Sequence, residues 1–195
     1  ISFEDDKFGV SFVDISTGEF ITTEVERFEN VLNEFSKFQP KEILIPLSYE
    51  NSKIIKPLQQ EQTLINPYSD VNFYFKNAYR NLKNHFEVDS LRGFGIENKE
   101  LSISASGALL EYVCETQKTS LSYINKLRYY STDDFMNLDK TTIMNLELIE
   151  NIIDKSKKSN LLNVIDKTTT SMGERLLKKN IQRPLLDIKK KKKRL

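Results

Sequence analysis

The chain has 195 residues with an ordinary composition, 38% hydrophobic and 29% charged. This length suits one or two domains, and this balance excludes general intrinsic disorder. The single cysteine, Cys114, allows no internal disulfide, and no stretch approaches the roughly 20 apolar residues of a membrane span. No signal-peptide pattern is present. These features predict a cytoplasmic protein with no membrane partner.

The net charge of +1 conceals an asymmetry along the chain. Residues 1–120 contain 12 basic and 19 acidic residues, a net charge of −7, whereas residues 121–195 contain 17 basic and 9 acidic residues, a net charge of +8. Six of the later positive charges form the run 189–194. A change of sign where the residue pattern also changes predicts two domains, 1–120 and 121–195.

The first segment alternates between strand and helix patterns. Residues 8–14 and 19–25 are β-like runs on either side of a Ser-Thr-Gly turn, and a helical spacing follows at Phe28, Val31, Leu32 and Phe35. The continuous apolar run 43–45 predicts a strand that is covered on both faces.

The pattern continues with a helix expected over 49–60 and a strand over 63–66. Asp70 is expected to cap a helix that runs to about His85, and a further helix is expected over 100–118, with Cys114 buried on its apolar side. A hairpin followed by crossover units predicts a mixed sheet flanked by helices.

The chain after residue 120 is expected to be mainly helical. One apolar stripe is formed by Ile143, Leu146, Ile149 and Ile153. Asn160 can cap a short helix, and Ser171 with Glu174 forms a capping-box signature for another. That last helix carries an apolar face and ends at Pro184, and the face consists of Met172, Leu176, Leu177 and Ile181.

The order of the residues in this C-terminal segment resembles the start of the core, or lever, domain of the MutS family of mismatch-recognition ATPases. The matching positions are Leu161, Leu162, Asp166, Thr168, Thr170, Met172, Gly173, Arg175, Leu176, Leu177, Pro184, Leu185 and Asp187. Four further blocks resemble the same family in the same order: FVDISTGEF at 12–20, LRGFG at 91–95, the helix 105–118 and NLEL at 145–148.

The resemblance implies an RNase H-like α/β connector domain followed by a truncated, mainly helical core domain. It also implies a role without chemistry of its own: this part of the protein would link mismatch binding to the ATPase and offer a docking surface to a MutL-type partner. The docking surface is expected on the solvated face of the 70–85 helix, with Arg80 and Asn81 pointing outward as partner-binding residues.

The same resemblance places other functions in parts that this sequence does not contain. ATP and Mg would bind to the longer protein, since the chain has no phosphate-binding Gly-x-x-x-x-Gly-Lys loop. Mismatched DNA would be contacted by other domains, because Phe3-Glu4-Asp5 is not the family's Phe-x-Glu mismatch reader. The full-length protein is expected to be a homodimer or heterodimer.

Signals for catalysis or metal binding are few. We expect no catalytic, cofactor-binding or metal-binding residue in this fragment. His85 is the only histidine, which excludes a zinc cluster in practice and favours a structural role for this side chain.

Two alternatives remain open at this point. An RNase H-like nuclease would use Asp14, but two-metal cleavage needs further converging carboxylates, and Asp14 also suits the Asp-Ile-Ser-Thr-Gly turn. A stand-alone interaction module could use the basic run 189–194 on phosphates or stack Tyr129 and Tyr130 on bases. For these groups, a solvated helix and strand packing are the simpler interpretations.

Overall fold

The computed structural model describes residues 1–60, 63–117, 121–136, 138–153, 156 and 159–192. The chain forms two compact units. Unit 1 consists of Ile1–Leu32 and Phe38–Ser131, and unit 2 consists of Asn33–Lys37 and Thr132–Leu195. The sequence places a domain boundary near residue 120, and the first compact unit extends to Ser131.

Unit 1 contains a four-stranded sheet in the order β1 (Ser2–Glu4), β2 (Lys7–Asp14), β3 (Glu19–Glu26) and β6 (Leu127–Tyr129). The first three strands are antiparallel neighbours, whereas β6 runs parallel to β3 with Phe20 opposite Leu127. Between β2 and β3 the backbone turns at Gly18, whose φ of +73° is readily adopted only by glycine. The hairpin predicted over 8–14 and 19–25 is therefore confirmed.

The strands β4 (Glu42–Pro46) and β5 (Leu64–Tyr68) form a separate parallel pair. Ile43, Leu44 and Ile45 are all buried, as the apolar run 43–45 predicts. The amino group of Ile1, next to β1, donates a hydrogen bond of 2.8 Å to the carbonyl oxygen of Leu44. This bond brings the β4 edge beside the β1 edge, so the predicted mixed arrangement of strands is present.

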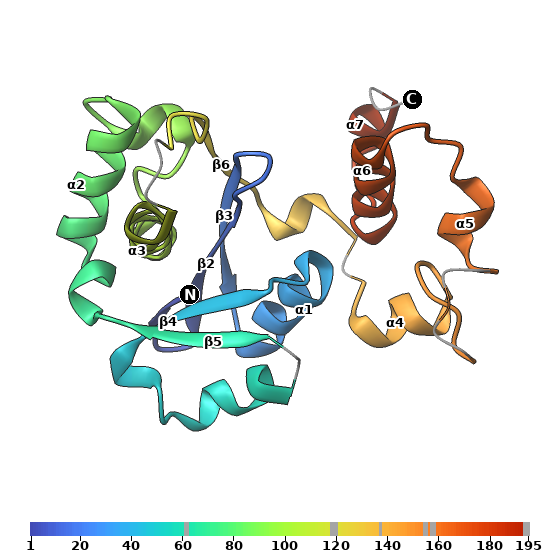
Figure 1. The fold of residues 1–195 in the computed structure, drawn as a ribbon, viewed down its shortest axis with the longest axis horizontal. Coiled ribbons are helices and arrows are strands. Elements are labelled where there is room, and N and C mark those ends of the chain that lie inside the picture. The colour runs from blue at the N-terminus through green and yellow to red at the C-terminus, as the bar shows by residue number, and fades with distance from the viewer. Residues whose placement is uncertain (61–62, 118–120, 137, 154–155, 157–158, 193–195) are drawn as a thin grey trace. The chain divides into compact units, whose positions relative to one another are not determined.

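Helices pack on these strands. Helix α1 (Phe28–Phe38) is shared, since its residues Asn33–Lys37 belong to unit 2, while α2 (Phe75–Phe86) and α3 (Glu100–Gln117) lie in unit 1. The middle of α3 consists mostly of small residues and is buried on all sides: Ser102, Ser104, Ala105, Ser106, Gly107 and Ala108. Figure 1 shows α3 nearly end-on beside α2. The largest core cluster of the described residues contains members from β3, α2, α3 and β6, such as Phe20, Leu82, Ile103 and Leu127.

Two glycines allow elements to approach closely in this core. A Cβ atom at Gly107 would lie 2.4 Å from the Cα of Ala78 on α2, and one at Gly9 would lie 2.1 Å from the carbonyl oxygen of Leu101. No side chain fits at such distances, so the positions of α2 and β2 against α3 depend on these glycines.

Two expected helices differ from the sequence prediction. The segment expected to be helical over 49–60 forms the 3₁₀ helices η1 (Leu47–Tyr49) and η2 (Lys53–Gln60), and Pro57 inside η2 cannot supply a helical N–H. The expected 70–85 helix is divided into η3 (Asp70–Phe73) and α2 by the extended backbone of Tyr74. Asp70 does not cap α2, because its carboxylate accepts a hydrogen bond of 2.7 Å from the Ser48 hydroxyl.

Unit 2 is mainly helical, as expected. It contains η5 (Thr132–Asp134), α4 (Lys140–Asn145), α5 (Leu161–Ile165), α6 (Ser171–Gln182) and α7 (Ile188–Lys192). Its core is formed by Leu138, Leu148, Ile149 and Leu162, with Ile143, Leu177 and Ile181 packed against them.

The single apolar stripe predicted over 143–153 is wrong. Helix α4 ends at Asn145, so the later residues leave the helical register. As a result Leu146 and Ile153 are exposed, while Ile149 is buried.

No helix in the described ranges is long and apolar enough to cross a membrane.

Candidate functional site: a cationic face on helix α2

Helix α2 has one face in the core and one face toward solvent. Ala78 and Leu82 are fully buried, and Ala78 lies against Gly107 of α3. Lys76 and Arg80 are exposed, which follows from the 100° step between successive helical residues. The structure therefore presents Arg80 to solvent, as the sequence predicts.

Asn81 is placed differently from the prediction. Its side chain is half-buried, and its Nδ2 donates a hydrogen bond of 2.9 Å to Oε2 of Glu111 on α3. The expectation that Asn81 points outward is wrong, because position 81 lies on the flank that packs toward α3. Asn81 thus orients α2 against α3.

The solvent face of α2 is positively charged. Lys76, Arg80 and Lys83 recur at spacings of four and three residues, and α2 contains no acidic residue. This helix lies in a segment, 1–120, whose net charge is −7. The spacing of the three cations and the absence of acidic residues are visible in the sequence and could have added Lys76 and Lys83 to the predicted site.

Exposed aromatic and apolar side chains lie in the same helix and just before it. Val71 and Tyr74 are 50% and 59% exposed, and Phe75 is 37% exposed. The Phe75 ring lies 5.6 Å from the Tyr79 ring, and the Lys83 ammonium lies 5.9 Å from the centre of the same Tyr79 ring. We call this surface, Val71, Tyr74, Phe75, Lys76, Tyr79, Arg80 and Lys83, the α2 face.

The carboxylate of Glu97 bonds Tyr79 of the α2 face to a neighbouring segment of the chain. The Tyr79 hydroxyl donates a hydrogen bond of 3.0 Å to Oε1 of Glu97, and the other oxygen of Glu97 accepts a bond of 2.9 Å from the backbone N–H of Leu91, the first residue of η4 (Leu91–Phe94). The hydrogen bond to Glu97 is the main cause that raises the pKa of Tyr79. Tyr79 therefore stays a neutral donor, and Glu97 connects it to the first residue of η4.

Asp14, the position of a nuclease carboxylate, serves the β2–β3 turn. Its Oδ1 accepts hydrogen bonds of 2.9 Å and 2.6 Å from the N–H and hydroxyl of Ser16. Partial burial opposes ionisation of Asp14, but the hydrogen bonds from Ser16 and Thr17 outweigh it and lower the pKa. Within the described ranges, no three His, Cys, Asp or Glu side chains are grouped to hold a metal ion. The geometry therefore supports the turn role.

The structure also places the two other residues considered in the sequence, His85 and Cys114. His85 Nε2 lies 2.8 Å from the carbonyl oxygen of Ile124 and is half-buried, which agrees with the expected structural role. Cys114 is exposed, so the prediction of a buried thiol is wrong. The reason is that α3 leaves the core near its C-terminal end, where Cys114, Glu115 and Thr116 all face solvent. Partial burial and the nearby carboxylates of Glu111 and Glu115 raise the pKa of Cys114, which disfavours the reactive thiolate.

Tyr129 and Tyr130 both pack within unit 1. Tyr130 is buried, and its N–H donates a hydrogen bond of 3.0 Å to the Thr22 carbonyl oxygen. The ammonium of Lys99 lies 5.3 Å from the centre of the Tyr129 ring. The packing interpretation of these two residues is confirmed, with Tyr129 as the last residue of β6.

The C-terminal motif forms two capped helices. Asn160 caps α5 by accepting a hydrogen bond of 2.7 Å from the Asn163 N–H, as predicted. Helix α6 is capped by Thr170, which accepts from the Gly173 N–H at 3.1 Å, and not by Ser171. On α6, Leu177 and Ile181 pack into the core of unit 2, while Met172 and Leu176 are exposed. The predicted apolar face of α6 is thus covered on one half only.

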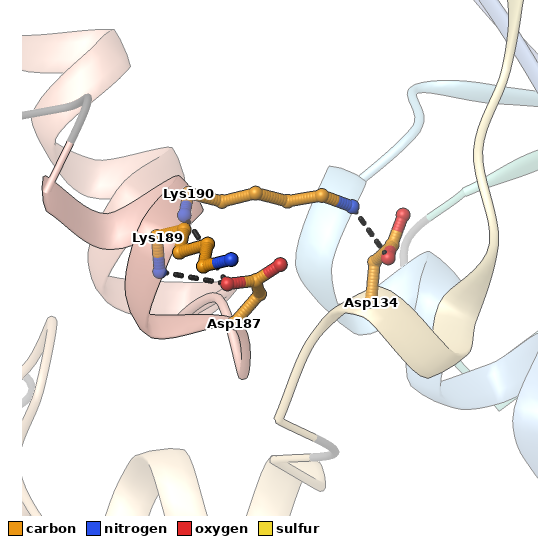
Figure 2. Close-up of polar contacts among 4 residues, drawn as sticks. All are labelled: Asp134, Asp187, Lys189 and Lys190. Carbon is orange, nitrogen blue, oxygen red and sulfur yellow. Dashed lines mark hydrogen bonds and ion pairs between the residues drawn. The ribbon is translucent and has the colours of Figure 1, made fainter.

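Helix α7 (Ile188–Lys192) contains the first four residues of the basic run 189–194. The last two residues of the run lie outside the described residues. Asp187 accepts hydrogen bonds from the N–H groups of Lys189 and Lys190 at 2.7 Å and 3.4 Å, which caps the helix. The Lys190 ammonium also donates a bond of 2.8 Å to Oδ1 of Asp134 (Figure 2). At least one cation of the run therefore has a partner within unit 2, and α7 agrees with the expected solvated helix.

Two family models match the chain over most of its length. The model described as MutS domain II matches residues 1–125, and the model described as MutS domain III matches residues 141–195. The chain belongs to the MutS family. Its relatives include the DNA mismatch repair protein MutS of Methanosarcina barkeri, 41% identical over 94% of this chain, and that of Clostridium novyi, 44% identical over 91%.

The chain spans about a fifth of the length of these relatives, 21% and 19% respectively. The MutS protein of Halothermothrix orenii is similar to the same extent, at 40% identity over 93% of the chain and 20% of its own length. The α2 face thus lies in the part that matches MutS domain II, and the capped helices α5 and α6 lie in the part that matches MutS domain III.

Proposed function

We propose that this chain of the MutS family is a mechanical link between mismatch binding and an ATPase, and that it carries the docking surface for a MutL-type partner. Unit 1 would be the connector domain, with an RNase H-like fold, and unit 2 the start of the core domain. The RNase H-like assignment is supported by three antiparallel strands, β1 to β3, followed by the parallel pair β4 and β5, with Leu44 of β4 bonded to the N-terminal residue beside β1.

The observation that carries the docking proposal is the charge and exposure of the α2 face. Three cations stand on a helix without acidic residues, in a segment that is otherwise net negative. Val71, Tyr74 and Phe75, which lie just before or at the start of the same helix, are also exposed. Aromatic and arginine side chains dominate the binding energy of protein interfaces, and complementary charge speeds and orients association. The matching surface on the partner would be acidic with an apolar centre.

Within this face, Arg80 and Asn81 have different roles. Arg80 is exposed and would contact the partner directly, since its planar guanidinium can bind a carboxylate through two N–H groups. Asn81 would position the face through its bond to Glu111 and would not itself be a contact. Substitution of Asn81 is therefore expected to affect stability as well as binding.

The proposal predicts that Arg80→Glu weakens binding of the isolated ATPase domain of a MutL-type protein to this 195-residue chain. We expect the Kd to rise by at least roughly tenfold, because one attractive charge becomes repulsive at the centre of the face. Binding should also weaken as salt is increased, since Lys76 and Arg80 are exposed. Isothermal titration calorimetry at two salt concentrations measures both effects.

The matched control is Lys56→Glu, an exposed lysine on η2 that changes the net charge by the same amount. Equal weakening by both substitutions would show a general charge effect and would contradict docking at the α2 face. Titration of a DNA duplex in parallel tests the alternative of a nucleic-acid surface: DNA binding abolished by Arg80→Glu, without any binding of the MutL-type domain, would replace the proposal.

The remaining activities are proposed for the longer protein. By membership of the family, ATP with Mg and mismatched DNA would bind to domains outside this chain, and the full-length protein would act as a dimer. A nucleotide-binding assay on the 195-residue chain checks this division, because saturable ATP binding by the chain alone would contradict it.

A further inference from the structure

The sequence block LRGFG at 91–95 contains η4, which the docking surface defined above does not include. Leu91 of η4 is fully buried, whereas Arg92 and Gly93 are exposed. A Cβ atom at Gly93 would meet nothing within 4 Å. The outer side of η4 is therefore open, and both the Arg92 side chain and the Gly93 backbone are accessible to another protein.

Contacts within unit 1 hold η4 against α2. The Phe94 ring lies 4.7 Å from the ring of Phe86, the last residue of α2. Glu97 makes a second link, since its carboxylate accepts hydrogen bonds from both the Tyr79 hydroxyl and the Leu91 N–H. The ring contact and the shared carboxylate involve different turns of α2, so together they fix the orientation of η4 on this helix.

Arg92 lies within electrostatic reach of the α2 face. The hydrogen bond to Glu97 is the main cause that raises the pKa of Tyr79, and the positive charge of Arg92 opposes this rise. Tyr79 belongs to the α2 face, and Arg80 follows it directly in the same helix. Arg80 and Arg92, which come from different segments of the chain, therefore lie near the same tyrosine.

The charges of both arginines are available to a partner. Among the ion pairs of the described residues, none includes Arg80 or Arg92. A guanidinium binds a carboxylate most strongly through two parallel N–H groups. Glu87 and Asp89, between α2 and η4, are also exposed, so this part of the surface is not uniformly positive. The two arginines thus fit a small acidic segment better than a broad negative surface.

We propose that η4 is part of the docking surface, and that Arg80 and Arg92 together bind one acidic segment of the MutL-type partner. This inference rests on the proposed docking function and deepens it, because it adds Arg92 and specifies the charge and size of the segment that is bound. The links through Glu97 and Phe94 hold the two backbone segments in place before binding. Only the arginine side chains have to become ordered, which lowers the entropic cost of docking.

The test measures binding of the isolated ATPase domain of a MutL-type protein to the 195-residue chain and to its Arg92→Glu and Arg80→Glu variants by isothermal titration calorimetry. We expect Arg92→Glu to raise the Kd by about five- to tenfold, because an attractive charge becomes repulsive. Lys56→Glu, an exposed charge reversal on η2, should leave the Kd unchanged. Thermal unfolding should give the same melting temperature for Arg92→Glu and the parent chain, since Arg92 is exposed.

The double variant Arg80→Glu/Arg92→Glu tests whether the two arginines bind the same segment. Residues that share a partner are coupled, so the rise in Kd should be at least about threefold smaller than the product of the two single rises. A rise that equals this product within about twofold would indicate two separate contacts and would contradict the shared acidic segment.

Amide NMR spectra of the parent chain give a readout that needs no substitution. Saturation with the partner domain should shift the amide signal of Gly93, because a segment bound to Arg92 covers this exposed backbone. A Gly93 signal that does not move at saturation would overturn the inclusion of η4.

Failure of this inference is distinguishable from failure of the docking function. If Arg92→Glu binds as tightly as the parent chain while Arg80→Glu binds weakly, η4 is excluded and docking at the α2 face stands. Equal weakening by Arg92→Glu and Lys56→Glu would show a general charge effect and would also exclude a specific role of Arg92. Unchanged binding in both arginine variants would contradict docking at the α2 face itself, and the inference would fail with it.

Discussion

Several side chains in unit 2 each accept a hydrogen bond from the N–H three residues later, at the beginning of a short helix. The distances are 2.6 Å from Thr142 to Asp139, 2.7 Å from Asn163 to Asn160 and 3.1 Å from Gly173 to Thr170. Helices α4 and α5 have only six and five residues, lengths at which an isolated helix is not stable in water. Single capping residues therefore contribute a large part of the local order of this unit.

Asp139 provides a prediction about pH. The hydrogen bonds from Thr142 lower its pKa below the ordinary value of 3.8. A lowered pKa means that the stabilising effect of the charged cap is present above the ordinary pKa and is lost as the pH falls through the lowered one. Asp139→Asn keeps a capping oxygen but removes the charge, so the variant should be less stable than the parent chain at neutral pH, and this difference should shrink at an acidic pH well below 3.8.

Thermal unfolding of the parent chain and of Asp139→Asn at both pH values measures this difference. The other carboxylates titrate equally in the two chains, so the comparison isolates position 139. A difference in melting temperature that is constant across the pH range would show that the charge of Asp139 does not act on α4.

At the scale of the elements, the contact between α2 and α3 decides how the α2 face is presented. Ala78 meets Gly107 without an intervening side chain, and Asn81 bonds to Glu111 one helical turn away on both helices. A glycine inside a helix is unfavourable by itself, so its presence at 107 indicates a demand for close packing.

Gly107→Ala is predicted to destabilise the chain by about 1–3 kcal/mol, because the new methyl group would overlap Ala78 and separate the helices. The control is Gly93→Ala, where a Cβ atom meets nothing within 4 Å, so the free energy of unfolding should stay the same or rise by about 0.5 kcal/mol. Chemical denaturation of the two variants measures these changes. A neutral Gly107→Ala would mean that α2 can move away from α3 without loss of packing.

The sequence predicted most elements of unit 1, because periodicity reports which side of a local segment is buried. The hairpin, the strand 43–45 and the α3 helix follow from patterns of apolar residues within ten or twenty positions. The burial of the middle of α3 was harder to predict: most of its buried residues there are serine, alanine and glycine, which resemble a solvent-exposed pattern. Only the close approach of Ala78 and of β2 reveals why small residues are needed there.

Two of the errors share a physical cause, which is competition from a partner that is distant in the sequence. Asp70 is a suitable helix cap by local rules, but Ser48 binds its carboxylate, and the chain turns at Tyr74 before α2 begins. Asn81 has a suitable position for a surface contact, but Glu111 draws it toward α3. The bridge between Phe135 and Leu185 could not be predicted at all, since it joins two single residues that are far apart in the sequence.

At the scale of the whole molecule, the compact unit and the family model end at different residues. The MutS domain II model matches residues 1–125, but β6 lies beyond this limit and covers β3 through Leu127. Leu127 and Tyr130 are both buried. A stable unit 1 therefore needs the residues up to Ser131.

We predict that a fragment of residues 1–131 unfolds at a higher temperature than a fragment of residues 1–125. Loss of two buried side chains removes about 1.5–3 kcal/mol each, which lowers the melting temperature by roughly 10 °C or more in a domain of this size. Differential scanning calorimetry of both fragments at equal concentration measures the shift. Equal melting temperatures would show that β6 is dispensable for the sheet.

The parallel pairing of β3 with β6 has a consequence for the synthesis of the protein. Strand β3 ends at Glu26 and its neighbour β6 begins at Leu127, so the ribosome adds about a hundred residues between them, which takes on the order of 5–20 s. During this interval the nascent chain has an open strand edge along β3, the kind of surface that pairs with other growing chains. The order of the strands thus makes the emerging polypeptide a substrate for chaperones until Leu127 has left the exit tunnel.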